Sequence, residues 1–478
     1  MYYKYQVMNN IKLAWRNLWR NRRRTLITAA SIFFAVFFAL LMRSMQLGTY
    51  DHMYRNVIES YSGYIQVQHE DFWDDKIVDN TFAIDRKTEE KILEHENVTA
   101  TIPRFESFAL ASNGPQTKGV LVMGVDPDQE EHLSKILDKM VLYRLTPEAT
   151  KRIRKDENIP GKVKELLPLF ENTAYSSAGR LQLDLDISED EAPGLMPLLK
   201  EYTVFENDRI HMGDPGAWVG DKLSQYLNLG IGDTLILISQ GYHASTAAGK
   251  YPIRGIVKMP LPDLDNKIVY LPLDICQGLY NAKGRLTSMS LAVEDNGDKA
   301  ISETMSEVSS LLPDGYRVMD WREMNDVTVS QMEADNKGGM IMLGILYLVI
   351  AFGVFGTVLM LTAERKREFG VLVAIGMQKK KLASVMSMEM FFIGLIGILA
   401  GAFVASGLIL WGVEHPLIFK GEIAKMFEDY GFEPQMAFWP IDTYYIWQMV
   451  IVAIMVLISI GYPLRKISGM KVVNALKT

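Results

Sequence analysis

The sequence predicts a membrane protein with four transmembrane α-helices, one N-terminal and three C-terminal, and a large external α+β domain between the first and the second. Four long apolar runs lie toward the two ends of the 478-residue chain, and the segment between the first two runs is charged and rich in strand patterns. Basic residues gather beside the apolar runs, so the net charge of −7 averages over two different environments.

The four apolar runs are long enough to cross a bilayer. The first is 26–43, whose uncharged part 26–42 spans about 26 Å of helix at 1.5 Å per residue. The basic RNRRR before it leaves a cleaved secretory leader as an alternative. The second is 338–363 and the third 382–412, which carries one charge, Glu389. The fourth, 444–464, begins with YYIW, a cluster that suits the headgroup interface.

Basic residues in the short loops set the orientation of such a protein. The loop 364–381 holds six Lys and Arg residues, whereas the loop 413–443 holds two against six acidic residues. The segment 1–25 and the tail 465–478 are basic as well. We therefore expect both termini and the middle loop in the cytoplasm, and 44–337 on the outer side.

The segment before the first apolar run, KLAWRNLWRNRRR, has helical periodicity, with tryptophans and arginines on different faces. Such a helix is expected to lie in the inner headgroup region of the lipid, although a simple topology signal would also explain its charge. The expected membrane-interface residues are Trp15, Trp19, Arg20, Arg22, Arg23 and Arg24.

The external segment is read as an α+β region of two interleaved subdomains. GYIQVQ, GVLVMGVDP, DTLILIS and YPIRGIV have strand patterns, and SMSLAVE, KAISETMSEVSSLL and GYRVMD read as strand, helix and strand. From about 131 to 209 the pattern becomes helical and charged, which predicts an insert. Its acidic run DLDISEDE is expected to be a solvated face.

No pattern typical of an enzyme occurs in the sequence. GxxxxGK[ST], HExxH and GxSxG are all absent, and the seven histidines show no metal-ligand spacing. We therefore expect no catalytic residue, no metal site and no nucleic-acid partner.

Some residues of the apolar runs are candidates for a structural or functional role. The carboxylate of Glu389 is expected either to face protein or water, or to lie shallow enough to favour the start of its helix. Gly397, Gly401 and Ala405 form a face of small residues suited to close helix packing. Candidates for a cargo cavity, with lipid-facing packing as the alternative, are Phe33, Phe34, Phe37 and Phe38.

The stretch ERKREFGVLVAIGM, 364–377, places a short apolar segment between two glycines on a charged base. A stop-transfer sequence would explain the charges but not the second apolar segment. This stretch and the one-plus-three arrangement of spans resemble the FtsX/MacB-like permeases of ABC transporters. LAWRNLWRNRRRT, GVDP and LGIGDTL support the resemblance, while the tail has Lys471 where a proline is usual.

In that family the matching segment is a coupling helix that docks into a groove of a separate ATPase subunit. The resemblance implies that Phe369, Leu372, Val373 and Ile375 fill the groove. It also implies that the chain is not itself an enzyme, because ATP and Mg would be bound by a partner ATPase dimer, and that a second permease copy or a paralogue completes the complex. The implied coupling residues are Glu364, Arg365, Arg367, Glu368, Phe369, Gly370, Leu372, Val373, Ile375 and Gly376.

Within the family the chain looks most like the lipoprotein-releasing LolC/LolE branch. This implies extraction of lipoproteins from the bacterial inner (cytoplasmic) membrane toward the outer membrane. The loop 240–250, with Gly241, Tyr242 and His243, takes the place of the hook for a periplasmic chaperone but lacks its prolines. The alternatives are a MacB-like exporter of periplasmic substrates and an FtsX-like regulator of a cell-wall hydrolase.

Overall fold

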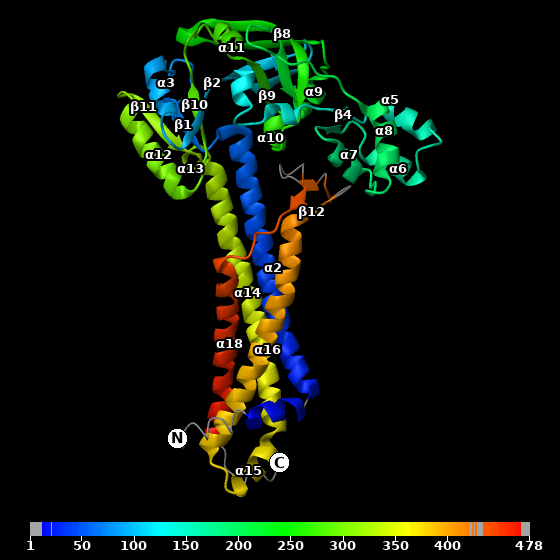
Figure 1. Ribbon diagram of the computed structural model, residues 1–478, viewed down its shortest axis with the longest axis vertical. Coiled ribbons are helices and arrows are strands. Elements are labelled where there is room, and N and C mark those ends of the chain that lie inside the picture. Colours follow the sequence, from blue (N-terminus) through cyan, green and yellow to red (C-terminus); the bar gives the residue numbers. More distant parts are fainter. Residues whose placement is uncertain (1–11, 21, 420–422, 425, 428–433, 470–478) are drawn as a thin grey trace. The chain divides into compact units, whose positions relative to one another are not determined.

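The computed structural model describes residues 12–20, 22–419, 423–424, 426–427 and 434–469 (Figure 1). The chain forms two compact units. The first, the membrane unit, comprises Met1–His52, Ser330–Leu417 and Met436–Thr478, and the second, the external unit, comprises Met53–Val329 and Ile418–Gln435. The predicted fold class of four long helices and an α+β region is confirmed.

The four helices are apolar and long enough to cross a membrane. Those of 36 and 39 residues measure about 54 and 58 Å, well beyond the roughly 30 Å of a hydrocarbon core. The predicted run 26–43 lies near the start of a longer helix, Arg22–Val57, and the run 338–363 lies at the end of another, Asp326–Glu364. The helices are α2 (Arg22–Val57), α14 (Asp326–Glu364), α16 (Lys379–Glu414) and α18 (Thr443–Ser468).

Small residues allow α16 and α2 to approach closely. A Cβ atom added to Gly397 would lie 2.8 Å from the carbonyl oxygen of Ala29, and one added to Gly401 would lie 2.6 Å from that of Phe33. Ala405 is fully buried on the same side of α16. The face of small residues seen in the sequence is thus a helix contact, in which backbones meet without intervening side chains.

One nine-stranded sheet organises the external unit. Its order is β11–β1–β10–β2–β3–β9–β6–β8–β7, and a further pairing of β2 with β7 closes the last six strands into a barrel. The bounds are β1 (Ile65–His69), β2 (Val98–Ser112), β3 (Thr117–Val125), β6 (Ala217–Gly220), β7 (Thr234–Gln240), β8 (Thr246–Val257), β9 (Ile268–Pro272), β10 (Ser288–Val293) and β11 (Tyr316–Asp320).

The strand β2 belongs to both parts of this sheet. Its first half pairs with β10 of the open part, and its second half pairs with β3 and β7 of the barrel. α12 (Asp298–Leu311) connects β10 to β11 and α3 (Arg86–Leu93) precedes β2. Inward-facing Ala109 and Leu235 help fill the barrel, whereas Met289 and Ile301 help form the core of the open part.

A helical insert lies between β3 and β6, in the region that the sequence assigns to one. Leu181 and Leu199 are fully buried in a hydrophobic core made by the insert's own residues. Most of the acidic run is exposed, but Asp184 is buried and lies 3.3 Å from Arg180 Nε. The insert holds β4 (Tyr143–Arg144), α5 (Pro147–Lys155), α6 (Gly161–Leu166), η3 (Leu167–Leu169), β5 (Ala174–Tyr175), α7 (Ala178–Asp184) and α8 (Ala192–Thr203).

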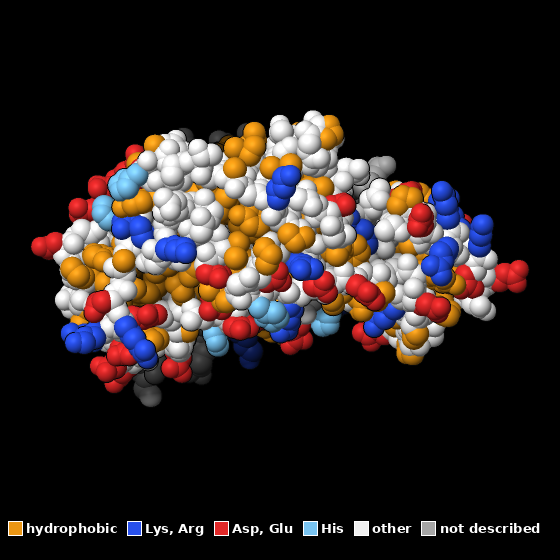
Figure 2. Space-filling view, turned by 90° about the horizontal axis from the view of Figure 1, so that it is seen from above, with side chains coloured by type: hydrophobic (Ala, Val, Ile, Leu, Met, Phe, Trp, Pro, Cys, Tyr) orange, Lys and Arg blue, Asp and Glu red, His pale blue; other side chains and the backbone are white. Residues whose placement is uncertain are grey.

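On the face shown in Figure 2, acidic, basic and apolar side chains are interspersed, as on an ordinary solvated surface.

Short elements complete the description. The remaining elements are η1 (Ile58–Ser62), α4 (Pro127–Glu130), η2 (Ile136–Lys139), α9 (Asp221–Leu227), η4 (Tyr242–Ala244), α10 (Pro262–Asp265), α11 (Leu273–Leu279), α13 (Trp321–Met324), α15 (Lys366–Ala374), β12 (Leu417–Ile418) and β13 (Gln435–Met436).

Candidate functional site

The candidate site is the short helix α15 with the residues that flank it. α14 ends at Glu364, Arg365 is the N-cap of α15, and the helix ends in a turn at Gly376, whose φ is +103°. The N–H of Met377 donates to the carbonyl of Leu372 at 2.9 Å, which closes the last turn. Glycine adopts this backbone conformation without strain, so the second glycine of the motif terminates the helix.

The inner face of α15 packs onto the membrane unit itself. Phe369 is 5% exposed and lies in the same core as Leu382 and Met386 of α16. Leu372 and Val373 are half-buried against that core. This corrects the expectation that Phe369 fills a groove in a partner, because its side chain is already enclosed by its own chain.

The outer face of α15 presents a small apolar surface. Val371 is 45% exposed and Ile375 is 75% exposed, and residues four apart lie on one side of a helix. The side chains of Glu364, Arg367 and Glu368 are exposed as well. Sequence reasoning found Ile375 but missed Val371, whose spacing from Ile375 was the available signal.

A buried ion pair lies at the base of α15. Arg365 and Glu389 are 6% and 5% exposed, and Arg365 Nη1 donates to Glu389 Oε2. Asn17 lines the same small pocket as this pair. Of the two alternatives for Glu389, the structure has the carboxylate facing protein.

Glu368, whose side chain is exposed, extends this pair toward the surface through two longer contacts. Glu368 Oε2 lies 3.9 Å from Arg365 Nε and 3.4 Å from Arg20 Nη2. Exposed pairs of this kind contribute little stability, typically below about 1 kcal/mol. The buried pair is therefore the contact that fixes the geometry.

The N-terminal segment is helical at residues 12–20. Trp15 and Trp19 are about half exposed, while Leu18 between them is 3% exposed and belongs to the membrane unit's core. The Trp15 ring meets Phe392 of α16 edge-on at 5.9 Å. Of the other interface residues that were predicted, Arg20, Arg22 and Arg23 are exposed, and the side chain of Arg24 lies outside the described part of the structure.

The four phenylalanines form a ladder along α2. Phe33 stacks on Phe37 at 5.8 Å and Phe34 on Phe38 at 5.9 Å between ring centroids. Phe34 and Phe38 are half exposed, as lipid-facing side chains would be, and Phe33 and Phe37 are half-buried. A cargo cavity at these rings stays a prediction.

The tip of the β7–β8 hairpin folds back onto the external unit. Pairing continues to Gln240 and Thr246, so the loop is shorter than the predicted 240–250. The N–H of His243 donates to Asp79 Oδ1 at 2.7 Å, and the guanidinium of Arg285 lies 4.8 Å from the ring centroid of Tyr242. The tip, formed by Gly241, Tyr242 and His243, therefore lies against the external unit and does not project from it.

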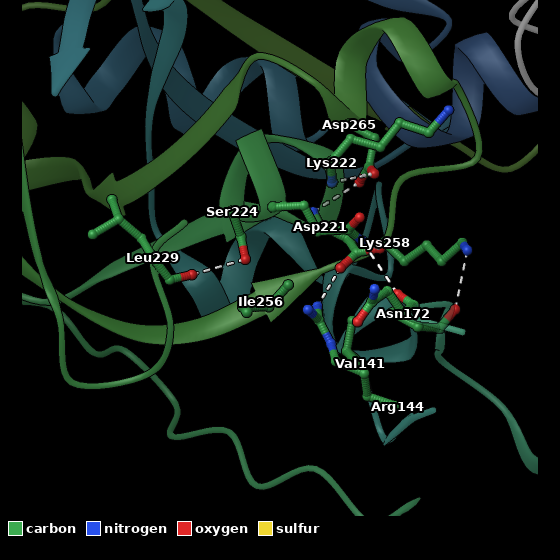
Figure 3. A network of polar contacts seen from close by, with 12 residues as sticks. Val141, Arg144, Asn172, Asp221, Lys222, Ser224, Leu229, Ile256, Lys258 and Asp265 are labelled. Carbon is green, nitrogen blue, oxygen red and sulfur yellow. Dashed lines mark hydrogen bonds and ion pairs between the residues drawn. The ribbon is translucent and has the colours of Figure 1, made fainter. Parts of the chain in front are cut away.

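A cavity of about 540 Å³ lies between the helical insert and the barrel, next to the polar network of Figure 3. Asp221 pairs with Arg144 of the insert, and Lys258 Nζ donates to the carbonyl of Ala174 at 3.0 Å. Burial lowers the pKa of Lys139, another lining residue, to about 8. Arg144, Asp221 and Lys258 thus fasten the insert to the barrel. The described residues contain no cluster of ligands that could hold a metal ion.

Residues 340–472 match the family model described as FtsX-like permease C-terminal. Curated relatives include the lipoprotein-releasing system transmembrane protein LolC of Xylella fastidiosa, 24% identical over 228 residues (46% of this chain, 54% of the relative). LolC of Neisseria meningitidis serogroup B is 22% identical over 241 residues (47% and 57%). An uncharacterized ABC transporter permease of Methanocaldococcus jannaschii is 23% identical over 216 residues (43% and 53%). The chain thus spans about half the length of the curated relatives it matches.

Two solved structures are similar to part of the chain. The extracellular domain of the noncanonic ABC-type transporter YknZ covers 54% of this chain and 100% of its own, with 9% identity and a TM-score of 0.28. The periplasmic region of MacB from Actinobacillus actinomycetemcomitans covers 57% and 95%, with 8% identity and a TM-score of 0.30.

Proposed function

We propose that the outer face of α15 docks onto a separate ATPase subunit, as the chain's similarity to FtsX-like permeases and to LolC implies. The observation that carries this proposal is the exposure of Val371 and Ile375 on a short helix whose base is fixed to the membrane unit. Exposed apolar side chains ringed by charged ones are typical of a protein interface. ATP and Mg would bind to the partner, an ATPase dimer, and this chain would supply the docking surface.

Two long helices would carry movement away from the docked α15. α14 runs without interruption for 39 residues up to Glu364, immediately before Arg365, and α16 begins shortly after Met377. A displacement of α15 therefore acts on the ends of both helices. The complex would be completed by a second copy of the permease or a paralogue.

Lipoproteins are the proposed cargo, extracted from a bacterial inner (cytoplasmic) membrane toward the outer membrane. The support is the similarity to LolC proteins, which are named for a lipoprotein-releasing system. The large external unit provides the surface on which such cargo or a periplasmic chaperone would be met.

The docking proposal is tested with the double variant Val371→Asp and Ile375→Asp. Two charges on the apolar surface should lower the amount of ATPase that co-purifies with a tagged chain at least about 10-fold, equal to about 1.4 kcal/mol of binding free energy. Mass spectrometry of the purified membrane complex measures this ratio.

The matched control is Val327→Asp, which adds the same charge at a 74% exposed valine near the start of α14. Val327 belongs to the external unit, so its variant should retain the ATPase. If the α15 double variant co-purified with as much ATPase as wild type does, α15 would not be the docking surface.

The cargo proposal needs its own assay. Depleting the chain should leave lipoproteins in the inner-membrane fraction of cells, and restoring it should release them. Release that is unchanged by depletion would contradict lipoprotein cargo and direct attention to a periplasmic substrate or a cell-wall hydrolase.

A further inference from the structure

The buried pair Arg365–Glu389 has a second property: it joins the N-cap of one helix to the first third of another. Arg365 precedes the first residue of α15, and its carbonyl accepts the N–H of Phe369 at 2.9 Å. Glu389 lies within α16 beside Met386 and Met390, which are both buried. We propose that Glu389 is a positioning residue that holds the first turn of α15 against α16.

The surroundings of the pair explain why it must stay closed. The apolar side chains of Met386, Met390 and Ile393 enclose it together with Leu18 from the N-terminal helix. A charge in such surroundings is costly unless it is paired, so opening the contact would leave two uncompensated charges. The pair is therefore closed in every arrangement that keeps both groups buried.

A third segment lies beside the same contact. Asn17 and Leu18 line the small pocket around the pair, so the N-terminal helix lies beside it. Three segments that are distant in sequence thus line one small pocket: residues 12–20, the start of α15 and the first third of α16.

This arrangement determines how α15 can move. Because Phe369 packs into the core and Arg365 is tied to Glu389, α15 is held at two points along one side. It cannot tilt alone, and a displacement of α15 also displaces α16. The role in coupling rests on the proposed docking of an ATPase, whereas the positioning itself does not.

The experiment uses the full chain in lipid nanodiscs with a nitroxide label at Ile375→Cys, since the native Cys276 is fully buried and will not compete for the label. The variants are Arg365→Gln, Glu389→Gln and the two together, and Lys380→Gln is the control that removes an exposed basic residue of the same loop. The mobile fraction of the label, read by electron paramagnetic resonance without any ATPase present, reports how firmly α15 is held.

Each single variant should raise the mobile fraction about two-fold or more, because the remaining charge is buried without its partner. In the double variant both charges are gone. The increase in the label's mobile fraction should therefore be smaller than the sum of the increases in the two single variants. Lys380→Gln should leave the spectrum unchanged.

An unchanged spectrum in both single variants would overturn the proposal, and so would a double variant whose effect equals the sum of the singles. Circular dichroism of each sample separates a loosened helix from an unfolded chain. Co-purification of the ATPase with the wild-type chain is measured separately, so a failure of docking is distinguishable from a failure of positioning.

Discussion

Asp265 is a carboxylate held almost out of water at the end of α10. It is 2% exposed and accepts backbone N–H groups of Asp221, Lys222 and Met259 at 3.2, 2.9 and 2.9 Å. Burial, followed by the nearby charge of Asp221, raises the pKa of Asp265 to about 6. The folded chain therefore binds a proton at this carboxyl at a higher pH than the unfolded chain does.

This difference predicts a pH dependence of stability with a definite sign. A raised carboxyl pKa means that the folded state holds more protons between about pH 4 and 6, so stability from this group increases as the pH falls through that window. Asp265→Asn removes the titration. On going from pH 7 to pH 5, wild type should gain thermal stability relative to Asp265→Asn, measured by calorimetry of the full chain in nanodiscs.

The control for the same measurement is Asp263→Asn, an exposed carboxyl of α10 paired with Lys267 at 2.9 Å. If Asp263→Asn changed the pH dependence as much as Asp265→Asn does, the effect would not be specific to Asp265. A constant difference between Asp265→Asn and wild type would show that Asp265 does not titrate in this window.

At the residue scale, the sequence identified α15 but not the face it presents. Phe369, Leu372, Val373 and Ile375 are all apolar, and nine residues of helix hold too few turns to reveal which of them face the chain's own core. Burial of Phe369 depends on Leu382 and Met386, which arrive from the next helix. The side of α15 that faces the core is therefore set by residues outside the helix, and the local sequence pattern does not reveal it.

At the element scale, the contact between α16 and α2 makes a prediction about glycines. Gly397→Ala and Gly401→Ala should each destabilise the membrane unit by about 1–3 kcal/mol, because the new methyl groups would meet backbone oxygens of α2 at 2.8 and 2.6 Å. Thermal unfolding in detergent, followed by retention on size-exclusion chromatography, measures the loss.

Gly407 provides the matched control on the same helix, since a Cβ there meets nothing within 4 Å. Gly407→Ala should be neutral or slightly stabilising, because alanine has the higher helix propensity. Equal effects at all three glycines would mean that helix propensity, and not packing against α2, determines the outcome.

The elements also show where sequence patterns stop being informative. The apolar runs were read correctly as spans, but α2 and α14 continue through polar residues that carry no hydropathy signal. The alternating GYIQVQ and the apolar GVLVMGV before its turn identified β1 and β3 directly. The pairing of β2 with β7 that closes the barrel joins segments more than a hundred residues apart, and local periodicity cannot specify it.

At the scale of the whole molecule, the distribution of basic residues predicts which surfaces meet the cytoplasm. Cysteines placed at Val204 and Ile375, which are 61% and 75% exposed, test this against a native Cys276 that is fully buried. A membrane-impermeant maleimide added to intact spheroplasts should label Val204→Cys. It should label Ile375→Cys only after the membrane is permeabilised. The reverse pattern would invert the topology and place α15 where no ATPase could reach it.

The helical insert leaves and re-enters the external unit at a single point. Leu142 and Phe205 flank it, and the N–H of Phe205 donates to the carbonyl of Leu142 at 2.9 Å, while Tyr143 and Val204 form a β-bridge. The two ends are already in contact, and the core of the insert is its own. A segment with such ends can be added to the chain without opening the barrel. Lengthening a connection between two fixed ends raises the entropic cost of closing it only slightly. The length and surface of the insert can therefore change without changing the pairing of the barrel strands.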